Sequence, residues 1–282
     1  MQNKVFSSNK TLNVGGRLIH FDTPKIMGIL NITPDSFFDG GKHRDEKSIL
    51  RLVEKMLNDG ADFIDVGGYS SRPGAEDISQ KEELERVIPA IKAIVKRFSE
   101  SIISIDTFRS EVARQAIEEG ALMVNDISGG TLDSKMFDLV VKHHVPYILM
   151  HMKGTPQTMK SMAEYENLIK EMLEYFHPKI NQLQQLGAAD IMIDPGFGFA
   201  KTITHNFELL KQLELLKILD KPMVIGLSRK SMIWKTLGTD PENALNGTTV
   251  LNTIALLKGA SILRIHDVKE AVEAVKLTNF VK

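Results

Sequence analysis

The chain has 282 residues, of which 43% are hydrophobic and 25% are charged. This length is compatible with about two domains at roughly 150 residues each, or with one β/α barrel of about 250 residues. The 35 basic and 36 acidic residues give a formal net charge of −1, which argues against a general nucleic-acid-binding protein with its basic excess. The absence of cysteine excludes disulfides, thiolate metal sites and a cysteine nucleophile.

The first residues, Met1 to Ser8, lack the apolar run of a signal peptide, and no stretch reaches the ~18 apolar residues that span a bilayer. We therefore expect a cytoplasmic protein with no membrane partner. Residues 11–21 (TLNVGGRLIHF) predict a β-hairpin that turns at Gly15-Gly16. We expect residues 1–24 to form an N-terminal extension whose hairpin closes the bottom of a single domain, residues 25–282.

From residue 25 onward, short apolar runs alternate with longer amphipathic segments. The runs are apolar on both faces, which predicts strands buried on both sides of a parallel sheet. In chain order they are KIMGILNIT (25–33), FIDVGG (63–68), IISIDT (102–107), MVNDIS (123–128), YILMHM (147–152), IMIDPG (191–196), MVIGLS (223–228) and ILRIHD (262–267).

The intervening segments have helical periodicity, and several end at a glycine that favours a helix stop. They cover residues 47–57 and about 80–98, 109–119, 133–143, 163–187, 203–219, 242–258 and 267–279. Eight strand–helix units predict an α/β protein with right-handed crossovers. A (β/α)8 TIM barrel is the expected fold, and an open doubly wound sheet is the alternative.

In a β/α barrel the active site lies at the carboxyl ends of the strands. Most of the predicted strands end in polar or charged residues: Asn31, Asp106, Asn125, Asp126, His151, Asp194, Ser228, Arg229, Lys230, Arg264, His266 and Asp267. If these ends converge, one rim holds carboxylates, amides and cations together. The loops at 31–41 and 70–75 are rich in Gly, Pro, Ser and Asp, and we expect them to close over a ligand.

Several of these residues also have a structural interpretation. An Asp at a strand end often caps the next helix, and Asp133 and Asp267 fit that role. Asp126 fits either role, and His151 is compatible with a core histidine whose hydrogen bonds are satisfied. Arg264 lies inside an apolar strand, where an unpaired guanidinium would be costly, so it needs an anionic partner.

Eight motifs lie in order along residues ~25–267: NITPDSFFDGG (31–41), GGYSSRPGA (67–75), SIDT (104–107), NDISG (125–129), LMHM (149–152), DPGFGFAK (194–201), GLSRK (226–230) and RIHD (264–267). Together they resemble the dihydropteroate synthase family of the folate pathway. The resemblance implies a (β/α)8 barrel, usually a homodimer. It also implies a reaction that joins (7,8-dihydropterin-6-yl)methyl diphosphate to 4-aminobenzoate, with sulfonamides as competing inhibitors.

The resemblance also assigns roles at the pterin. Asp194 would accept hydrogen bonds from the amino group and ring N–H, as a carboxylate does from arginine. Asp106 and Asn125 would bind other ring nitrogens, and Lys230 would donate to the carbonyl and N5 side. Asp106 would further stabilise the cation left by dissociative, SN1-like cleavage of the C–O bond.

For the leaving diphosphate, the resemblance implies Asn31, Ser71, Arg72, Arg264 and His266. It implies Mg²⁺ as cofactor, with Asn31 as a direct ligand, since this ion prefers oxygen donors and phosphates. Asp39 or Asp35 would act through water or order the loop. The residues implied to be catalytic are Asn31, Arg72, Asp106, Lys230, Arg264 and His266.

For 4-aminobenzoate, the implied residues are Ser71, Arg72, Pro73, Phe199, Lys230 and Ser231. Three positions depart from the family pattern: Tyr69 replaces Glu or Gln, Ser71 replaces Thr, and Ala200 replaces a frequent Gly. Two other interpretations remain open. One is a methyltetrahydrofolate-dependent corrinoid methyltransferase, which needs no diphosphate site, and the other is a non-catalytic pterin-binding barrel.

Overall fold

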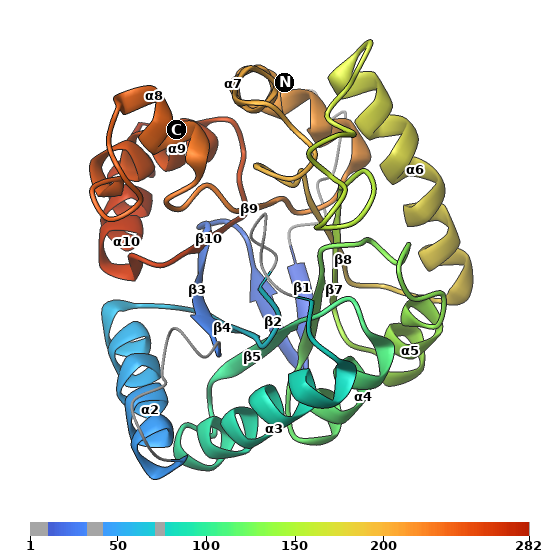
Figure 1. The fold of residues 1–282 in the computed structure, drawn as a ribbon, viewed down its shortest axis with the longest axis vertical. Helices are drawn as coiled ribbons and strands as arrows, with labels where there is room; N and C mark the ends of the chain where they lie inside the picture. Colours follow the sequence, from blue (N-terminus) through green and yellow to red (C-terminus); the bar gives the residue numbers. More distant parts are fainter. Residues whose placement is uncertain (1–10, 33–41, 71–76, 282) are drawn as a thin grey trace, which may run out of the picture.

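In a computed structural model, residues 11–32, 42–70 and 77–281 are described, and eight of their strands form one parallel sheet that curves into a ring (Figure 1). Their apolar side chains point to both faces, as expected for strands covered on both sides. The strands are β3 (Lys25–Asn31), β4 (Phe63–Gly67), β5 (Ile102–Asp106), β6 (Met123–Asp126), β7 (Tyr147–Met150), β8 (Ile191–Asp194), β9 (Val224–Ile225) and β10 (Ile262–Ile265).

The strands follow one another around the ring in chain order from β3 to β8, and β10 and β9 lie on the other side of β3. A parallel bridge between Ile193 and Met223 joins β8 to the residue before β9 and closes the ring. This singly wound order excludes the open doubly wound sheet. The predicted (β/α)8 barrel is therefore confirmed.

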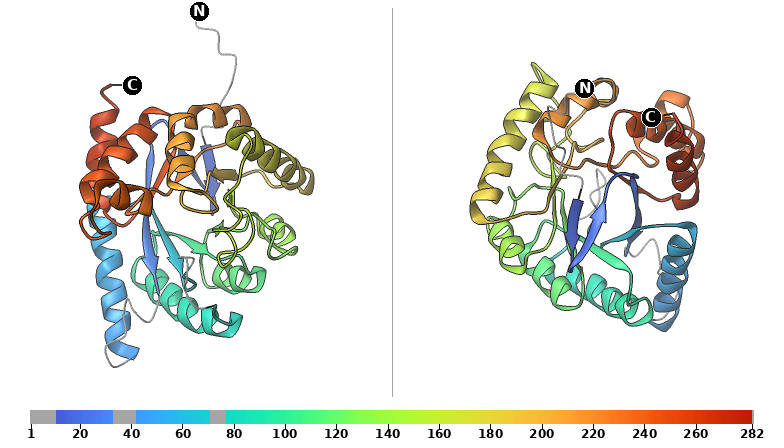
Figure 2. Two further views of the ribbon diagram at one scale, coloured as in Figure 1. Left: turned by 45° about the horizontal axis from the view of Figure 1, so that its top comes forward. Right: turned by 180° about the vertical axis from the view of Figure 1, so that it is seen from behind.

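Helices surround the ring, as Figure 2 shows from two further directions. Local signals set their ends: the side chains of Ser79 and Asn167 accept backbone N–H groups at two helix starts, and Gly187 ends one helix in the left-handed conformation. The helices are α2 (Lys42–Asp59), α3 (Gln80–Arg97), α4 (Ser110–Glu118), α5 (Met136–His143), α6 (Leu168–Leu186), α7 (Ile203–Lys211), α8 (Ser231–Leu237), α9 (Leu245–Leu257) and α10 (Val268–Thr278). None of the described helices is long and apolar enough to cross a membrane.

Three segments differ from the expected helices and strands. The segment expected as one helix at 203–219 divides into α7 and a 3₁₀ helix, η1 (Leu213–Leu219), and α8 was not expected at all. β9 has two residues instead of the six in the apolar run 223–228, because residues 226–230 after it do not continue the strand.

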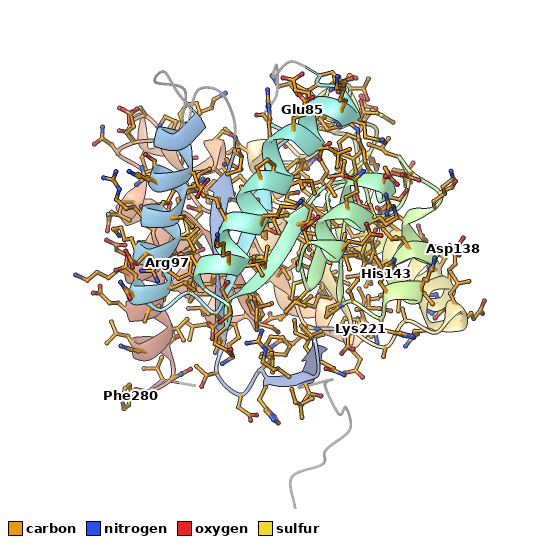
Figure 3. All side chains as sticks on the ribbon, turned by 90° about the horizontal axis from the view of Figure 1, so that it is seen from below. Glu85, Arg97, Asp138, His143, Lys221 and Phe280 are labelled. Atoms are coloured by element: carbon orange, nitrogen blue, oxygen red, sulfur yellow. The ribbon has the colours of Figure 1, made fainter. Side chains whose placement is uncertain are left out.

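The N-terminal hairpin, β1 (Thr11–Val14) and β2 (Arg17–His20), lies across one end of the barrel, near Lys221 (Figure 3). Leu12 and Val14 of β1 are buried against a layer to which each of the eight strands contributes one apolar side chain: Met27, Phe63, Ile102, Met123, Ile148, Met192, Val224 and Ile262. The hairpin therefore closes the bottom of the barrel, as predicted.

The opposite end of the barrel has a different lining. Alternate residues of a strand point to the same face, so the interior positions of β4 are Phe63, Asp65 and Gly67, and β10 continues from Ile262 to Arg264. The interior thus changes from apolar to charged within a few residues. This polar end, where the carboxyl ends of the strands meet, is called the mouth below.

Candidate functional site

The mouth contains a pocket with about 340 Å³ of space not filled by atoms, part of it open to solvent. It brings together five of the polar residues expected at the rim, from strands β5, β6, β8 and β10 and from the loop after β9. The residues that line it are Asp106, Asn125, Ile127, Met150, Asp194, Gly196, Phe197, Phe199, Gly226, Lys230 and Arg264.

Arg264 lies between two carboxylates on the inner face of the barrel. Its Nε donates to Asp65 Oδ2 at 2.6 Å, and its Nη2 donates to Asp106 Oδ2 at 2.5 Å. The expectation that this buried arginine needs an anionic partner is confirmed, and it has two. Removal from water raises the pKa of Asp106 above its ordinary value, although the Arg264 charge opposes this.

Asp65 is a residue that the sequence analysis did not select. Its side chain is fully buried, and its Oδ2 also accepts a hydrogen bond from Asn125 Nδ2 at 2.9 Å. It therefore fixes both Arg264 and Asn125. The argument applied to Arg264 would have found it, since a carboxylate inside the apolar run FIDVGG also needs a partner.

Gly67 leaves space between two predicted site residues. A Cβ atom at this position would lie 3.5 Å from Asp106 Oδ2 and 3.7 Å from Asn31 Oδ1. Asn31, at the end of β3, thus lies next to Asp106 on the rim. The space that a side chain would fill is flanked by two oxygens.

Asp194 ends β8, is nearly fully buried, and accepts a hydrogen bond from Gly196 N–H at 2.7 Å through Oδ1. Desolvation raises the pKa of Asp194, while the Gly196 N–H and the Lys230 and Arg264 charges act in the opposite direction. A carboxylate in this position can accept two further hydrogen bonds from the edge of a planar ligand.

Lys230 and Phe199 also line the pocket and lie side by side. The Lys230 ammonium lies 4.3 Å from the centroid of the Phe199 ring, a distance at which a cation is attracted to the ring face. A Cβ at Gly198 would be 3.0 Å from Lys230 Cδ, so glycine allows this close approach. Burial lowers the pKa of Lys230 to about 8. The adjacent Ser231 is exposed at the start of α8.

His266 is exposed beside the pocket and is linked to Ser228. The Ser228 hydroxyl accepts the His266 backbone N–H at 3.1 Å, and its Oγ lies 2.9 Å from the ring Nδ1. If the hydroxyl donates to Nδ1, the ring proton is on Nε2 and can be offered to an anion. Ser228 is therefore a positioning partner of His266.

Arg229 and Asp267 are not part of the pocket lining, although both follow strands that reach the mouth. The Arg229 guanidinium donates to both carboxylate oxygens of Asp267, at 2.8 and 3.0 Å. The expectation that Asp267 caps a helix is corrected: it occupies the cap position of α10, but its side chain makes no capping hydrogen bond.

Three other candidates have structural partners. Asp126 accepts from Ser128 N–H, Gly130 N–H and the Tyr147 hydroxyl, so it holds a turn. His151 is buried and hydrogen-bonded, as its core interpretation predicted. Asp133 accepts the N–H of the first residue of α4 at 2.7 Å, so it satisfies the neighbouring helix as well as its own turn.

Some predicted site residues lie outside the described residues, namely Ser71, Arg72, Pro73, Asp35 and Asp39. Their assigned roles stay predictions. Tyr69, just before this second loop, is described: its hydroxyl accepts from Gln157 Nε2 at 2.7 Å, and its ring meets Phe108 edge to face. The residue that departs from the family pattern thus joins two loops of the mouth.

Comparison with known proteins gives a consistent result. Residues 27–266 match the family model described as pterin binding enzyme. The chain is 45% identical over 257 residues to dihydropteroate synthase from Synechocystis sp., covering 90% of this chain and 89% of the relative. A Yersinia pestis dihydropteroate synthase in complex with a sulfonamide drug superposes with a TM-score of 0.90 at 37% identity, covering 96% of this chain and 98% of the other. A Xanthomonas albilineans dihydropteroate synthase with 4-aminobenzoic acid gives 0.89 at 36% identity, with the same coverage.

Proposed function

Because the chain belongs to the dihydropteroate synthase family of pterin-binding enzymes, we propose that it performs that family's reaction in folate biosynthesis. It condenses (7,8-dihydropterin-6-yl)methyl diphosphate with 4-aminobenzoate to give 7,8-dihydropteroate and diphosphate. The observation that carries this assignment is the mouth pocket, in which Asp194, Asn125 and Lys230 line the same space as Arg264.

The pterin half of the pocket fits a flat heterocycle with a donor edge. Asp194 accepts from the amino group and ring N–H, and the Asn125 amide, held by Asp65, supplies a further polar contact. Lys230 donates to the carbonyl side. A site that pairs each polar atom in this way discriminates by about 10⁴ or more against analogues that lack the matching groups.

The diphosphate half uses Arg264 of β10 and His266, which follows this strand. As the methylene–oxygen bond breaks, the bonding electron pair leaves with the diphosphate, and Arg264 and His266 stabilise its growing charge together with Asn31. One well-placed donor of this kind contributes roughly 3 kcal/mol to the lowering of a barrier. Arg72 and Ser71 are proposed to assist from the second loop.

The carbon left behind is a cation conjugated with the dihydropterin ring, and Asp106 is proposed to stabilise that cation with its negative charge. The amine of 4-aminobenzoate forms the new C–N bond with its lone pair, and its proton passes to solvent. We assign the benzene ring to Phe199 and the carboxylate end to Lys230 and Ser231, with Ser71, Arg72 and Pro73 completing this half. Sulfonamides are expected to compete for the same half.

Magnesium is proposed as the cofactor, bound through Asn31. The donor chemistry fits, because the space above Gly67 is flanked by the oxygens of Asn31 and Asp106, and Mg²⁺ prefers oxygen ligands together with phosphate. When bound, the ion would neutralise charge on the diphosphate. Chelation with excess EDTA should stop turnover, and added Mg²⁺ should restore it. Full activity in excess EDTA would remove the metal from the proposal.

The direct test is to incubate the purified protein with both substrates and Mg²⁺ and to measure dihydropteroate and released diphosphate. Equal molar amounts of the two products are expected. Binding of both substrates without turnover would support a non-catalytic pterin-binding protein. Methyl transfer from methyltetrahydrofolate to a corrinoid protein would support the methyltransferase interpretation instead.

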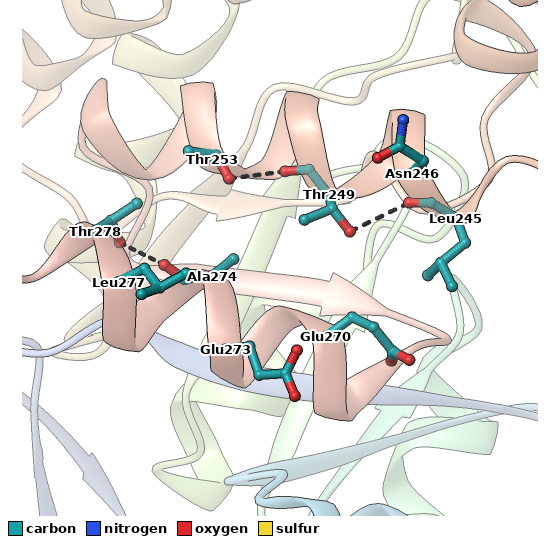
Figure 4. A pocket seen from close by; sticks show the side chains of 9 residues that line it. All are labelled: Leu245, Asn246, Thr249, Thr253, Glu270, Glu273, Ala274, Leu277 and Thr278. Atoms are coloured by element: carbon teal, nitrogen blue, oxygen red, sulfur yellow. Dashed lines mark hydrogen bonds between the residues drawn. The ribbon is translucent and has the colours of Figure 1, made fainter.

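A homodimer is proposed through the outer faces of α9 and α10. α9 (LNGTTVLNTIALL) has no charged residue, yet Val250 and Leu257 are half exposed, and Leu277 of α10 is 71% exposed. Exposed apolar side chains that lie together commonly mark an interaction surface. Figure 4 shows the groove between these helices, which has about 800 Å³ of space not filled by atoms, part of it open to solvent, and is lined in part by Thr249, Thr253 and Glu273.

Sedimentation tests this interface. The chain should sediment as a dimer, and Val250→Glu should convert it to a monomer, whereas Leu18→Glu on the exposed hairpin should not. The cytoplasmic location also remains a prediction, and fractionation of expressing cells tests it.

A further inference from the structure

A buried lysine links the two halves of the pocket. Lys201, in the loop between β8 and α7, is 9% exposed, and its ammonium lies in hydrogen-bonding distance of three acceptors. These are His151 Nδ1 at 3.0 Å, Gly196 O at 3.0 Å and Phe199 O at 3.1 Å. An ammonium has three N–H donors, so all of them are used.

Two of these acceptors belong to Gly196 and Phe199, which line the pocket, and the third belongs to His151. The N–H of Gly196 donates to Asp194 Oδ1, so the position of this residue orients the pterin-binding carboxylate. Phe199 carries the ring that lies beside Lys230. His151 follows β7, and its backbone N–H donates to the carbonyl of Asp194 at 2.9 Å.

The loop has a conformation that needs such support. Gly196, Gly198 and Ala200 all have positive φ, at 69°, 81° and 47°. The left-handed conformation costs roughly 1 kcal/mol for alanine and persists where the surroundings impose it. A Cβ at Gly196 would lie 2.1 Å from the His151 carbonyl oxygen, so the loop packs tightly on β7.

We propose that Lys201 is a positioning residue that holds the β8–α7 loop in the form that binds both substrates, with Gly196 on the pterin side and Phe199 on the aminobenzoate side. This inference rests on the proposed function. It assigns Lys201 no contact with substrate: its effect passes through Asp194 and Phe199.

The charges around Lys201 are compatible with this role at neutral pH. Burial lowers the pKa of Lys201 to about 7, and it lowers the pKa of His151 well below its ordinary value, so His151 is a neutral acceptor. The other ionisable groups that face this pair are Asp194, Lys230, Lys153, Tyr165 and Tyr175.

Loss of the Lys201 proton does not break the three contacts. The neutral amine still donates to both carbonyls, and it accepts from His151 when the imidazole proton moves to Nδ1. These hydrogen bonds therefore hold the β8–α7 loop both below and above the pKa of Lys201. A substitution that removes the nitrogen should release it at every pH.

The test compares Lys201→Met with Lys211→Met, a change of the same chemistry at an exposed lysine on α7. In Lys201→Met, the Kd for 6-hydroxymethyl-7,8-dihydropterin and the KM for 4-aminobenzoate should both rise about tenfold, since misplacement by about 1 Å is costly in such sites. Lys211→Met should leave both unchanged. Lys201→Gln, which keeps donors, should give a smaller change in both constants.

Measurement of both the pterin Kd and the aminobenzoate KM separates a positioning role from a general loss of structure. Phe199→Ala should change only the aminobenzoate constant and Asp194→Asn mainly the pterin constant, whereas Lys201→Met changes both in protein that melts cooperatively. Unchanged constants in Lys201→Met would overturn the inference. So would failure of both Lys201 variants to fold, since the lysine would then serve folding itself. A wild type without turnover would instead refute the proposed function.

Discussion

The two ends of the barrel are built from the same strands, but their interior side chains serve different purposes. At the bottom, each strand contributes an apolar side chain to a layer sealed by Leu12 and Val14. At the mouth, positions further along the same strands carry Asp106, Asn125 and Arg264. The bottom is stabilised by the packing and burial of apolar side chains, whereas at the mouth side chains of opposite charge pair with one another.

This difference has energetic consequences. Burial of an apolar side chain at the bottom stabilises the fold, and we assign these side chains no part in the reaction. The mouth instead holds Asp65, Asp106 and Arg264 in contact with little water, and a buried ion pair of this kind contributes little net stability. Substitutions at the mouth should therefore change turnover, and those that remove one member of this group should also lower stability, because they leave a buried charge unpaired. Substitutions at the bottom should change stability alone.

The largest effect is expected for Arg264→Met. The change removes the guanidinium that we propose stabilises the leaving diphosphate, and kcat/KM should fall by about 10³, or roughly 4 kcal/mol. Steady-state kinetics measures this, with the surface variant Arg114→Met as the control that should retain activity. An equal loss in turnover and in binding of diphosphate-free pterin would contradict the leaving-group role.

Asp194→Asn should come next. The amide accepts fewer hydrogen bonds than the carboxylate and turns N–H groups toward a donor edge, so the pterin Kd should rise about 100-fold. Calorimetric titration measures the change. The matched control is Asp190→Asn at the other end of β8, where Oδ1 accepts the N–H of Asn13 in the hairpin. If the two variants bind pterin equally well, Asp194 does not bind the pterin edge.

The sequence predicted the bottom of the barrel more completely than the mouth. Strands that are buried on both faces have a strong apolar signal, and the hairpin has a two-glycine turn, so both could be recognised. α8 was missed and the strand predicted at 223–228 was too long, because short elements carry too little periodicity.

At the mouth, the polar strand ends were recognised but their pairing was not. Asp267 was expected to cap a helix, and it binds Arg229 because the two meet across neighbouring strand ends. Lys201 is a functional candidate only when its partners are known, and for Asp65 the sequence shows the need for a partner but not which residue it is. Their contacts link residues 199 and 50 positions apart, at Arg264 and His151, which local patterns cannot show.

At the bottom, Leu12→Ala should lower the free energy of unfolding by about 2 kcal/mol, since the cavity between the hairpin and the interior layer cannot fully collapse. Denaturant titration measures the loss, and Leu18→Ala, at a leucine of β2 that is 58% exposed, should cost much less. kcat and both KM values should stay unchanged in folded Leu12→Ala protein. A fall in kcat would show that the hairpin also shapes the mouth.

The smallest effect is a pH dependence at Lys230, for which activity and stability should change in opposite directions. Burial lowers the pKa of Lys230 to about 8, so its ammonium is lost as the pH rises through 8, and kcat/KM should fall about tenfold per pH unit above that value.

The stability of the fold should change in the opposite sense to kcat/KM. Between pH 8 and the ordinary lysine value of 10.5, the unfolded chain binds the proton that the folded chain has released. The contribution of Lys230 to the free energy of unfolding therefore rises across this window. The pH profile of kcat/KM and denaturant titrations at pH 8 and 10 test both signs. Lys230→Arg, which stays charged, should lose the alkaline fall at pH 8. Retention of that fall in Lys230→Arg would assign it to another group.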